Sequence, residues 1–597
     1  MTGSGRPIAG VSPSSGVPES TREQANRVIV AVTGHRNLVD SELAEIRARV
    51  RDLFRDLVDR FPWCRLTVLS PLAEGADLLV GEVAVEMDLD LVVPLPKPRG
   101  EYLADFTHPE AVRAFERVAS AAVDVFEVVG DAPPPPPGTD PDRWARDYPY
   151  ARLGVYFSAH CHILLAIWDG EPSVHLGGTA QVVRFHQDDV MPGVTSATVA
   201  TQQMLVDDES DLVYHIVCSR TDRAGTPRDG LRPGQTFWYS KDPENPRSSE
   251  MPLQHRVIFE RHAEFSRDAT RFSERIDVET PSLLPEAPAH PWPPGLDTMD
   301  RLFRVADWLA IRYQTRTLWT LRTTHLCAFL TGLMFILYTD LSTSSRFLVG
   351  FLLFLGISLG ANALARRGGW HRKYLDYRTL AEGLRVQTYW AMAGVVPESR
   401  WKFAHDSYLK GQNPEFGWIR NVMRIAGMRY DACPNGSDAA MAAAVGAWIG
   451  SEDRGQLGYF RTKARDRLRQ LARTRAVGRL SLGVSALTVL VFVFLGSRLP
   501  PDVLGVLTVV MGCSLLLFAV REGYGYATAV KELIKQYEFM LRIYENADRR
   551  MRDATSTHDR RQILLALGQS TLNEHSDWLL MHRERLFEDA KLWRLGG

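Results

Sequence analysis

The sequence contains little that points to a metal, a disulfide framework or a nucleic acid. Its six cysteines are scattered without CxxC spacing, which argues against a zinc site and paired disulfides and predicts buried thiols in a reducing compartment. Its 70 Lys and Arg are matched by 71 Asp and Glu, so the net charge of −1 supplies no overall positive field. Nucleic-acid binding usually needs such a field, and we therefore expect no nucleic-acid partner and no metal.

The first 26 residues lack any apolar core. They are rich in Gly, Ser and Pro, which fits neither a signal peptide nor a membrane anchor. We expect residues 1–26 to form a disordered leader. With 597 residues, of which 45% are hydrophobic and 24% charged, the chain is long enough for several ordered domains.

Four apolar stretches contain no Asp, Glu, Lys or Arg, namely 323–339, 347–365, 480–497 and 503–520. At a rise of about 1.5 Å per residue, helices of this length are at the lower end of what crosses about 30 Å of hydrocarbon. The connectors DLSTSSR and RLPPD are too short to hold a domain. The pattern predicts two transmembrane helical hairpins. The alternative, two buried hairpins in a soluble protein, would need a larger core than the remaining helices supply.

Cationic residues flank these stretches on one side. Arg322 precedes the first pair, Arg366 and Arg367 follow it, and Arg475 and Arg479 precede the second pair. Because Lys and Arg near a span tend to stay in the cytoplasm, both hairpins should enter from that side. We expect a multi-pass protein of the inner (cytoplasmic) membrane, with its soluble domain and both termini cytoplasmic.

The two pairs look like a repeat. Each has a basic helix before it and a long amphipathic helix after it, WHRKYLDYRTLAEGLRVQTYW in one case and ATAVKELIKQYEFMLRIYENA in the other. These long cytoplasmic helices are equally suited to packing on one another and to assembling a homo-oligomer. We place the first two-transmembrane unit at 300–435 and the second, with the C-terminal helices, at 436–597.

This arrangement resembles the SLATT family of two-transmembrane modules, closely over about 300–430 and loosely over about 455–590. The resemblance implies an effector that forms pores or otherwise perturbs membranes in prokaryotic defence. Because the four stretches carry no Asp, Glu, Lys or Arg, a pore would be lined by small polar residues. Candidates are Ser358, Asn362, Ser485 and Thr488.

Residues 27–220 alternate short strand-like runs with helical ones, from RVIVAVTG and RLTVLS to CHILLAIWDG and VYHIVCSR. This order predicts an α/β Rossmann-like parallel sheet with crossover helices. Residues 221–299, rich in Pro and charged residues, are expected to be a connector with one charged helix. Parallel sheets bind ligands beyond the carboxyl ends of their strands, so the residues that follow each strand are the candidates.

Four such positions carry small or polar residues. Thr33–Arg36 follow the first strand, and the motif SPLAEGAD places Gly75 directly before a helix. Asp169 and Gly170 end a later strand, and Gly177–Thr179 open the next helix. Glycine lets the backbone approach a ligand, and amides at a helix N-terminus bind phosphate oxygens. The set predicts a nucleotide or phosphosugar site.

The motifs SPLAEGAD and WDGEPSVHLGGTAQVV resemble the SLOG superfamily, a Rossmann-like group that includes Smf DNA-processing proteins, Lonely Guy phosphoribohydrolases and the N-terminal regions of TRPM channels. The resemblance covers about 27–220 and implies a nucleotide pocket in which Asp77 and Asp169 touch ribose or base. The predicted ligand-binding residues are Thr33, Gly34, His35, Arg36, Glu74, Gly75, Asp77, Asp169, Gly170, Gly177, Gly178 and Thr179.

One departure from that superfamily bears on catalysis. Its phosphoribohydrolases follow the glycine turn with a glutamate, whereas GGTAQVVRFHQDD has none in the first helical turns. Glu74 would be a substitute from another loop, but a glutamate before a helix-opening glycine is more often a solvated or capping group. We therefore predict no catalytic residue and a domain that binds a nucleotide second messenger or nucleotide derivative without turning it over.

Two functions follow from these patterns. In the first, a cytoplasmic nucleotide-sensing domain controls a membrane effector in prokaryotic defence or stress response. In the second, the protein is a membrane-anchored nucleotide-processing enzyme, like a phosphoribohydrolase, whose transmembrane helices only tether it. Release of free base or ribose phosphate by the purified protein distinguishes the second from the first.

Overall fold

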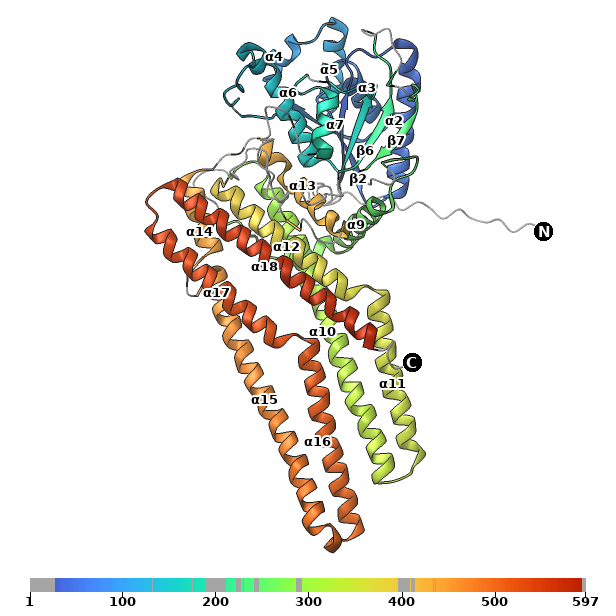
Figure 1. The fold of residues 1–597 in the computed structure, drawn as a ribbon, viewed down its shortest axis with the longest axis vertical. Helices are drawn as coiled ribbons and strands as arrows, with labels where there is room; N and C mark the ends of the chain where they lie inside the picture. Colours follow the sequence, from blue (N-terminus) through green and yellow to red (C-terminus); the bar gives the residue numbers. More distant parts are fainter. Residues whose placement is uncertain are drawn as a thin grey trace, which may run out of the picture.

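The structure of the protein is a computed structural model in which a sheet with its helices lies at one end and long helices extend from it (Figure 1). The structure describes residues 27–130, 132–173, 175–188, 191, 211–221, 227–228, 230–240, 246–285, 292–395, 408–409, 414–432, 434, 436–451 and 453–592. The expected leader at 1–26 lies outside the described residues.

The N-terminal region is built on an eight-stranded mixed sheet. Its strands are β1 (Arg27–Gly34), β2 (Arg65–Leu69), β3 (Asp90–Leu95), β4 (Asp124–Glu127), β5 (Ile163–Trp168), β6 (Val213–Val217), β7 (Thr236–Tyr239) and β8 (Arg247–Ser248). They lie in the order β4-β3-β2-β1-β5-β6-β7-β8. The expected parallel pairing is confirmed for β1 to β6, whereas β7 and β8 pair antiparallel at one edge. Those two strands lie beyond residue 220, in the part expected to be a connector.

The helices around the sheet are α2 (Leu43–Arg60), α3 (Ala76–Glu86), α4 (Arg99–Ala104), α5 (Pro109–Ser120), α6 (Pro141–His160) and α7 (Thr179–Asp188). Successive side chains of a strand point to opposite faces of the sheet. On β1, Val28, Val30 and Val32 belong to the core that α2 and α3 cover, whereas Ile29 and Ala31 belong to the core on the α6 side. Because both faces are covered, the central strands are almost continuously apolar.

Long helices make up the rest of the chain (Figure 1). They are α9 (Leu253–Glu279), α10 (Leu296–Asp340), α11 (Ser345–Arg367), α12 (Trp370–Ala393), α13 (Gly417–Ala432), α14 (Asp438–Trp448), α15 (Gly455–Leu495), α16 (Pro501–Ala527), α17 (Val530–Asp553) and α18 (Thr557–Leu592). Four of them, α10, α11, α15 and α16, are long and apolar enough to cross a membrane, as expected. Their outer faces expose large apolar side chains such as Leu352 (65%), Val493 (70%) and Phe494 (72%). Apolar exposure on this scale is typical of a lipid-facing surface.

The four apolar helices form one group. Helix α10 packs along α11 and α15 packs along α16, but α10 also packs along α16. Glycines permit the last contact, since a Cβ on Gly332 would lie 2.7 Å from Leu516 and one on Gly512 would lie 3.1 Å from Ile336. Small residues play this part in many membrane helix contacts. The expected description as two separate hairpins is therefore too simple.

The core on the α6 side of the sheet continues into the long helices. One cluster of buried side chains runs from β1 and α6 through α9 and α13 into α10, α12 and α18. Buried polar contacts reinforce the junction. The Tyr156 hydroxyl donates to the carbonyl of Met428 at 2.7 Å, and Arg424 donates to the carbonyl of Cys161 at 3.0 Å. Helix α9, the charged helix of the expected connector, is itself part of this shared core.

Candidate ligand-binding site

A cavity of about 510 Å³ opens at the carboxyl ends of β1 and β5. The chain runs from β1 to β2 on one side, while β5 lies on the other, so the strand order reverses between β1 and β5. Such a reversal leaves a crevice at the sheet edge, and cavities of this size hold small-molecule ligands. The predicted ligand-binding residues that line the cavity are Thr33, Gly34, His35, Arg36, Asp77, Gly177, Gly178 and Thr179.

Two glycines bring the loops after β1 and β2 into contact. A Cβ on Gly34 would lie 2.3 Å from the Cβ of Ala76. Gly75 has φ of 89°, and a Cβ there would lie 2.3 Å from the carbonyl oxygen of Arg36. The Ala76 amide donates to the carbonyl of His35 at 3.1 Å, so this amide at the start of α3 already has an acceptor. Gly75 does not line the cavity, and the motif SPLAEGAD holds α3 against the first loop.

The glycine turn before α7 faces the cavity. Gly177 has φ of 74°, and a Cβ there would lie 2.6 Å from the backbone nitrogen of Ala151 in α6. Gly178 and Thr179 follow at the N-terminus of α7. In the described part of the chain, the amides of Thr179 and Ala180 have no backbone acceptor. Free amides and the helix dipole favour an anion at this point.

Besides Gly75, three further predicted residues, Glu74, Asp169 and Gly170, do not line the cavity. Glu74 caps α5, because its Oε1 accepts hydrogen bonds from the amides of Thr107 and His108, both at 2.8 Å. Burial alone would raise the pKa of Glu74, but these hydrogen bonds lower it overall. Glu74 thus acts as a capping group, but for α5 and not for α3, the helix that follows it in the chain. Gly170, with φ of 82°, forms the turn after β5.

Asp169 does not line the cavity but contacts two residues that do. Its Oδ1 lies 3.1 Å from His35 Nε2, and its Oδ2 lies 2.7 Å from Arg220 Nε. Burial alone would raise the pKa of Asp169, but the contacts with His35, the Glu171 amide and Arg220 lower it. The ionised carboxylate therefore holds His35 and Arg220, both of which line the cavity.

Two buried polar side chains in the cavity wall lack partners. Asp77 is 8% exposed, and its Oδ1 has no hydrogen-bond partner among the described residues. Burial raises the pKa of Asp77 to about 8, although nearby Arg36 opposes the rise. Tyr102 is fully buried, and its hydroxyl also has no partner in the described part of the chain. Buried polar groups without partners are uncommon in folded proteins and often mark functional sites.

A series of contacts links Arg36 to the segment after β3. The guanidinium carbon of Arg36 lies 5.5 Å from the centroid of the Tyr150 ring. The Tyr150 hydroxyl donates to Asp105 Oδ2 at 2.5 Å, and Lys97 Nζ donates to the same oxygen at 2.7 Å. Burial alone would raise the pKa of Asp105, but these two donors lower it. The cavity thus presents a cation and an aromatic ring on one wall.

Several lining residues were missed by reasoning from the sequence. Arg220 comes just after β6, so the strand-end rule could have found it. Tyr150, Arg146 and Asp147 come instead from the crossover helix α6, and no strand-end signal marks a position inside a helix. Asp105 comes from the segment after β3, which contains α4.

Comparison with known protein families and with curated proteins found no match to this chain. In the described residues, no group of three or more His, Cys, Asp or Glu is placed to hold a metal ion. The chain is thus defined by its architecture, as a mostly parallel α/β sheet domain joined to a helical region with four candidate membrane helices. Its candidate site combines three arginines, a helix N-terminus, a buried carboxyl and a buried phenol around one cavity.

Proposed function

We propose that this protein is a nucleotide-sensing membrane effector. A phosphorylated nucleotide binds in the cavity and shifts the apolar helices between a silent and a membrane-permeabilising assembly. The observation that carries the proposal is the composition of the cavity wall. Arg36, Arg220 and the N-terminus of α7 favour a phosphate, while Asp77 and Tyr102 offer unused hydrogen-bonding capacity to a base or sugar.

The biological setting of the proposal comes from the two family resemblances. SLOG-like domains and SLATT-like modules belong together in prokaryotic defence systems, so we assign the sensor to defence or stress response. The cations that flank the apolar helices support our assignment of the sheet domain and both termini to the cytoplasmic side.

Helix α6 connects the cavity to the long helices. Tyr150, Gly154 and Phe157 of this helix line the cavity. At its C-terminal end, His160 Nδ1 lies 3.0 Å from the carbonyl oxygen of Arg424 in α13. Because one continuous helix carries both sets of contacts, a ligand that displaces its cavity-lining part also displaces α13.

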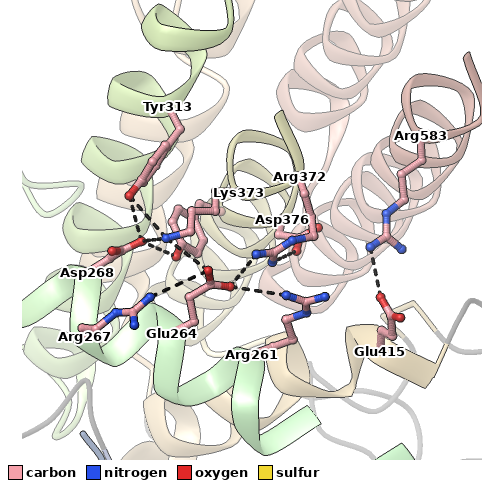
Figure 2. A network of polar contacts seen from close by, with 11 residues as sticks. Arg261, Glu264, Arg267, Asp268, Tyr313, Arg372, Lys373, Asp376, Glu415 and Arg583 are labelled. Carbon is pink, nitrogen blue, oxygen red and sulfur yellow. Dashed lines mark hydrogen bonds and ion pairs between the residues drawn. The ribbon is translucent and has the colours of Figure 1, made fainter. Parts of the chain in front are cut away.

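A buried ionic cluster links α9 to α10 and α12 (Figure 2). Lys373 Nζ of α12 lies 2.6 Å from Asp268 Oδ2 and 3.2 Å from Glu264 Oε1, both of α9. The hydroxyls of Tyr313 in α10 and Tyr377 in α12 donate to the same Asp268 oxygen at 2.9 Å and 2.8 Å. Separating buried charged partners is costly, so α9, α10 and α12 move together. Since α10 and α12 lie on either side of α11 in the chain, the cluster couples the sheet domain to the first apolar pair.

The permeabilising state is an assembly of several copies. Ser485 and Thr488 of α15, expected to line a pore, are 3% and 5% exposed, and their hydroxyls donate to carbonyls of their own helix. They face protein in this arrangement. Asn362 of α11 is exposed, so a polar path forms only where α11 meets another copy. Changing such an assembly from mostly silent to mostly open requires about 5.5 kcal/mol of differential ligand affinity.

A second candidate function is a membrane-anchored nucleotide-processing enzyme. The observation that favours it is the opposite pKa shift of two carboxyl groups in one cavity. Burial raises the pKa of Asp77 to about 8, whereas the contacts of Asp105 with Lys97 and Tyr150 outweigh burial and lower its pKa. One protonated and one ionised carboxyl is the combination that glycosidic cleavage uses. Release of free base from a nucleotide, lost in Asp77→Asn, would favour the enzyme over the sensor.

Calorimetry on the full chain in detergent micelles tests the sensor proposal. At least one mononucleotide, dinucleotide or cyclic nucleotide should give saturable heat, and that nucleotide alone should trigger dye leakage from liposomes that carry the protein. Gly178→Glu should abolish both effects, because a carboxylate at the N-terminus of α7 repels phosphate.

Gly100→Glu is the matched control. A Cβ at Gly100, in α4, would meet no atom within 4 Å, and Gly100 does not line the cavity, so binding and leakage should be unchanged. Absence of heat with every nucleotide class would refute binding. Leakage that is independent of nucleotide would refute gating.

A further inference from the structure

Helix α15 carries arginines that the rest of the described chain does not use. We call Arg469, Arg473, Arg475 and Arg479 the α15 collar. All four are exposed, and none forms an ion pair within the described residues. The surrounding segment 461–479 contains eight Lys or Arg and one Asp, in a chain whose net charge is −1. This concentration of unpaired charge lies immediately before the apolar part of the helix.

The helix before the first apolar stretch uses most of its cations internally. Arg304 donates to backbone carbonyl groups of the segment after α9 and of α9 itself. Arg312 lies 4.2 Å from the ring centroid of Phe272, and Arg316 lies 5.3 Å from that of Trp370. The two basic helices therefore differ, since the first stabilises the fold whereas the collar is free for a partner outside the chain.

Contacts between helices place the collar at the edge of the apolar layer. A Cβ on Gly478 would lie 3.1 Å from the guanidinium of Arg521, so the charged end of α16 is level with the collar. The ring of His325 in α10 lies 5.3 Å from that of Tyr524 in α16, and Arg322 comes just before His325. The apolar parts of α10, α15 and α16 thus end near one plane, which is where lipid headgroups begin.

The collar is within electrostatic range of that plane. From Arg469 to Arg479 the helix advances by ten residues, or about 15 Å at 1.5 Å per residue. Long side chains and a Debye length of about 8–10 Å cover this distance. Guanidinium groups bind phosphate oxygens in pairs of parallel hydrogen bonds, which suits the phosphodiester of a lipid.

We propose that the α15 collar binds the headgroups of anionic phospholipids. Charge complementarity identifies the occupant, because the collar is cationic, unpaired and held at the membrane surface. The collar anchors the second apolar pair to an anionic leaflet, and the corresponding helix of the first pair has no comparable group of unpaired cations. The proposal rests on membrane insertion of α15 and is independent of nucleotide binding.

Lipid retention by the full chain tests this inference. The protein is placed in nanodiscs of equimolar phosphatidylcholine and phosphatidylglycerol, released in mild detergent, and its retained lipids are identified by native mass spectrometry. The wild type should retain phosphatidylglycerol preferentially, and high salt should weaken the preference. Changing any one of the collar arginines to Gln should lower the ratio of retained phosphatidylglycerol to phosphatidylcholine about fivefold. Changing all four to Gln should abolish the preference for phosphatidylglycerol. Equal retention of the two lipids by the wild type would overturn the proposal.

Two further variants act as controls. A fourfold Arg→Lys variant of the collar keeps the charge and should keep the preference. Arg549→Gln with Arg550→Gln removes exposed cations near the C-terminal end of α17, which lies by α14 and away from the apolar layer, and should change nothing (Figure 1). An unchanged preference in the fourfold Gln variant, with or without a change in subunit number, would show that the collar does not bind lipid. If that variant does not fold, a salt-insensitive preference in the wild type leads to the same conclusion.

Discussion

Replacing Asp77 by Asn tests whether the buried carboxyl of the cavity is neutral at physiological pH. Asn has nearly the shape of a neutral carboxyl group but does not titrate. In the wild type, burial raises the pKa of Asp77 from 3.8 to about 8 against the opposing effect of Arg36. Between these two values the folded chain keeps a proton that the unfolded chain has released. The contribution of Asp77 to stability is therefore complete below about pH 4 and is lost as the pH rises to about 8.

The size of this change in stability follows because the folded chain binds one proton more than the unfolded chain within this pH range. Each pH unit within this window lowers the free energy of unfolding by about 1.4 kcal/mol. Between about pH 5 and pH 7, the wild type should therefore lose about 3 kcal/mol relative to Asp77→Asn. Denaturant unfolding of the full chain in detergent micelles, followed by tryptophan fluorescence, measures this difference. Asp553→Asn, at an exposed position, should follow the wild type.

Parallel stability curves for the wild type and Asp77→Asn would refute the reasoning. That result would mean that Asp77 is ionised in the folded protein at neutral pH, with Arg36 or water stabilising the charge. The carboxyl would then be a poor partner for a phosphorylated ligand, and the enzyme alternative would lose its acid.

Two further substitutions probe the helical region. Lys373→Met should lower the free energy of unfolding by about 3–5 kcal/mol, because Asp268 would stay buried without its cation. The melting temperature of the full chain in detergent measures this loss. An unchanged melting temperature would contradict the buried ion pair between Lys373 and Asp268. Gly568→Ala should lower the free energy of unfolding by about 1–3 kcal/mol, because the new Cβ would lie 2.4 Å from the Trp390 indole. Gly446→Ala, where the new Cβ on α14 would meet no atom within 4 Å, should instead raise the free energy of unfolding by about 0.5–1 kcal/mol. Both variants are compared by thermal melts followed by circular dichroism. Equal effects of the two alanines would argue against the packing of α18 on α12.

Local patterns predicted much of the architecture. The starts of α3 at Ala76 and α7 at Thr179 match the glycine turns that precede them. The apolar helices could be located because an uninterrupted run without charges is a property of neighbouring residues alone. The parallel order of β1 to β6 followed from the alternation of strands and helices.

The site was predictable in part. Residues that follow different strands do come together, since Arg36, Asp77 and Thr179 line one cavity. The same rule could not separate a glycine that faces a ligand from one that packs on backbone. Gly75 belongs to the second kind, because its missing side chain leaves room for the Arg36 carbonyl. That distinction depends on which loop lies opposite, and the loop comes from a different part of the chain.

By itself, the sequence determined most of the parallel strands and which helices suit a membrane, because both depend on short-range periodicity and hydropathy. Only the tertiary structure decided that α9 joins the shared core, that α10 packs on α16, and that Asp77 and Tyr102 lack partners. These features arise from contacts between residues far apart in the chain, and burial that raises the pKa of a carboxyl exists only after those contacts have excluded water.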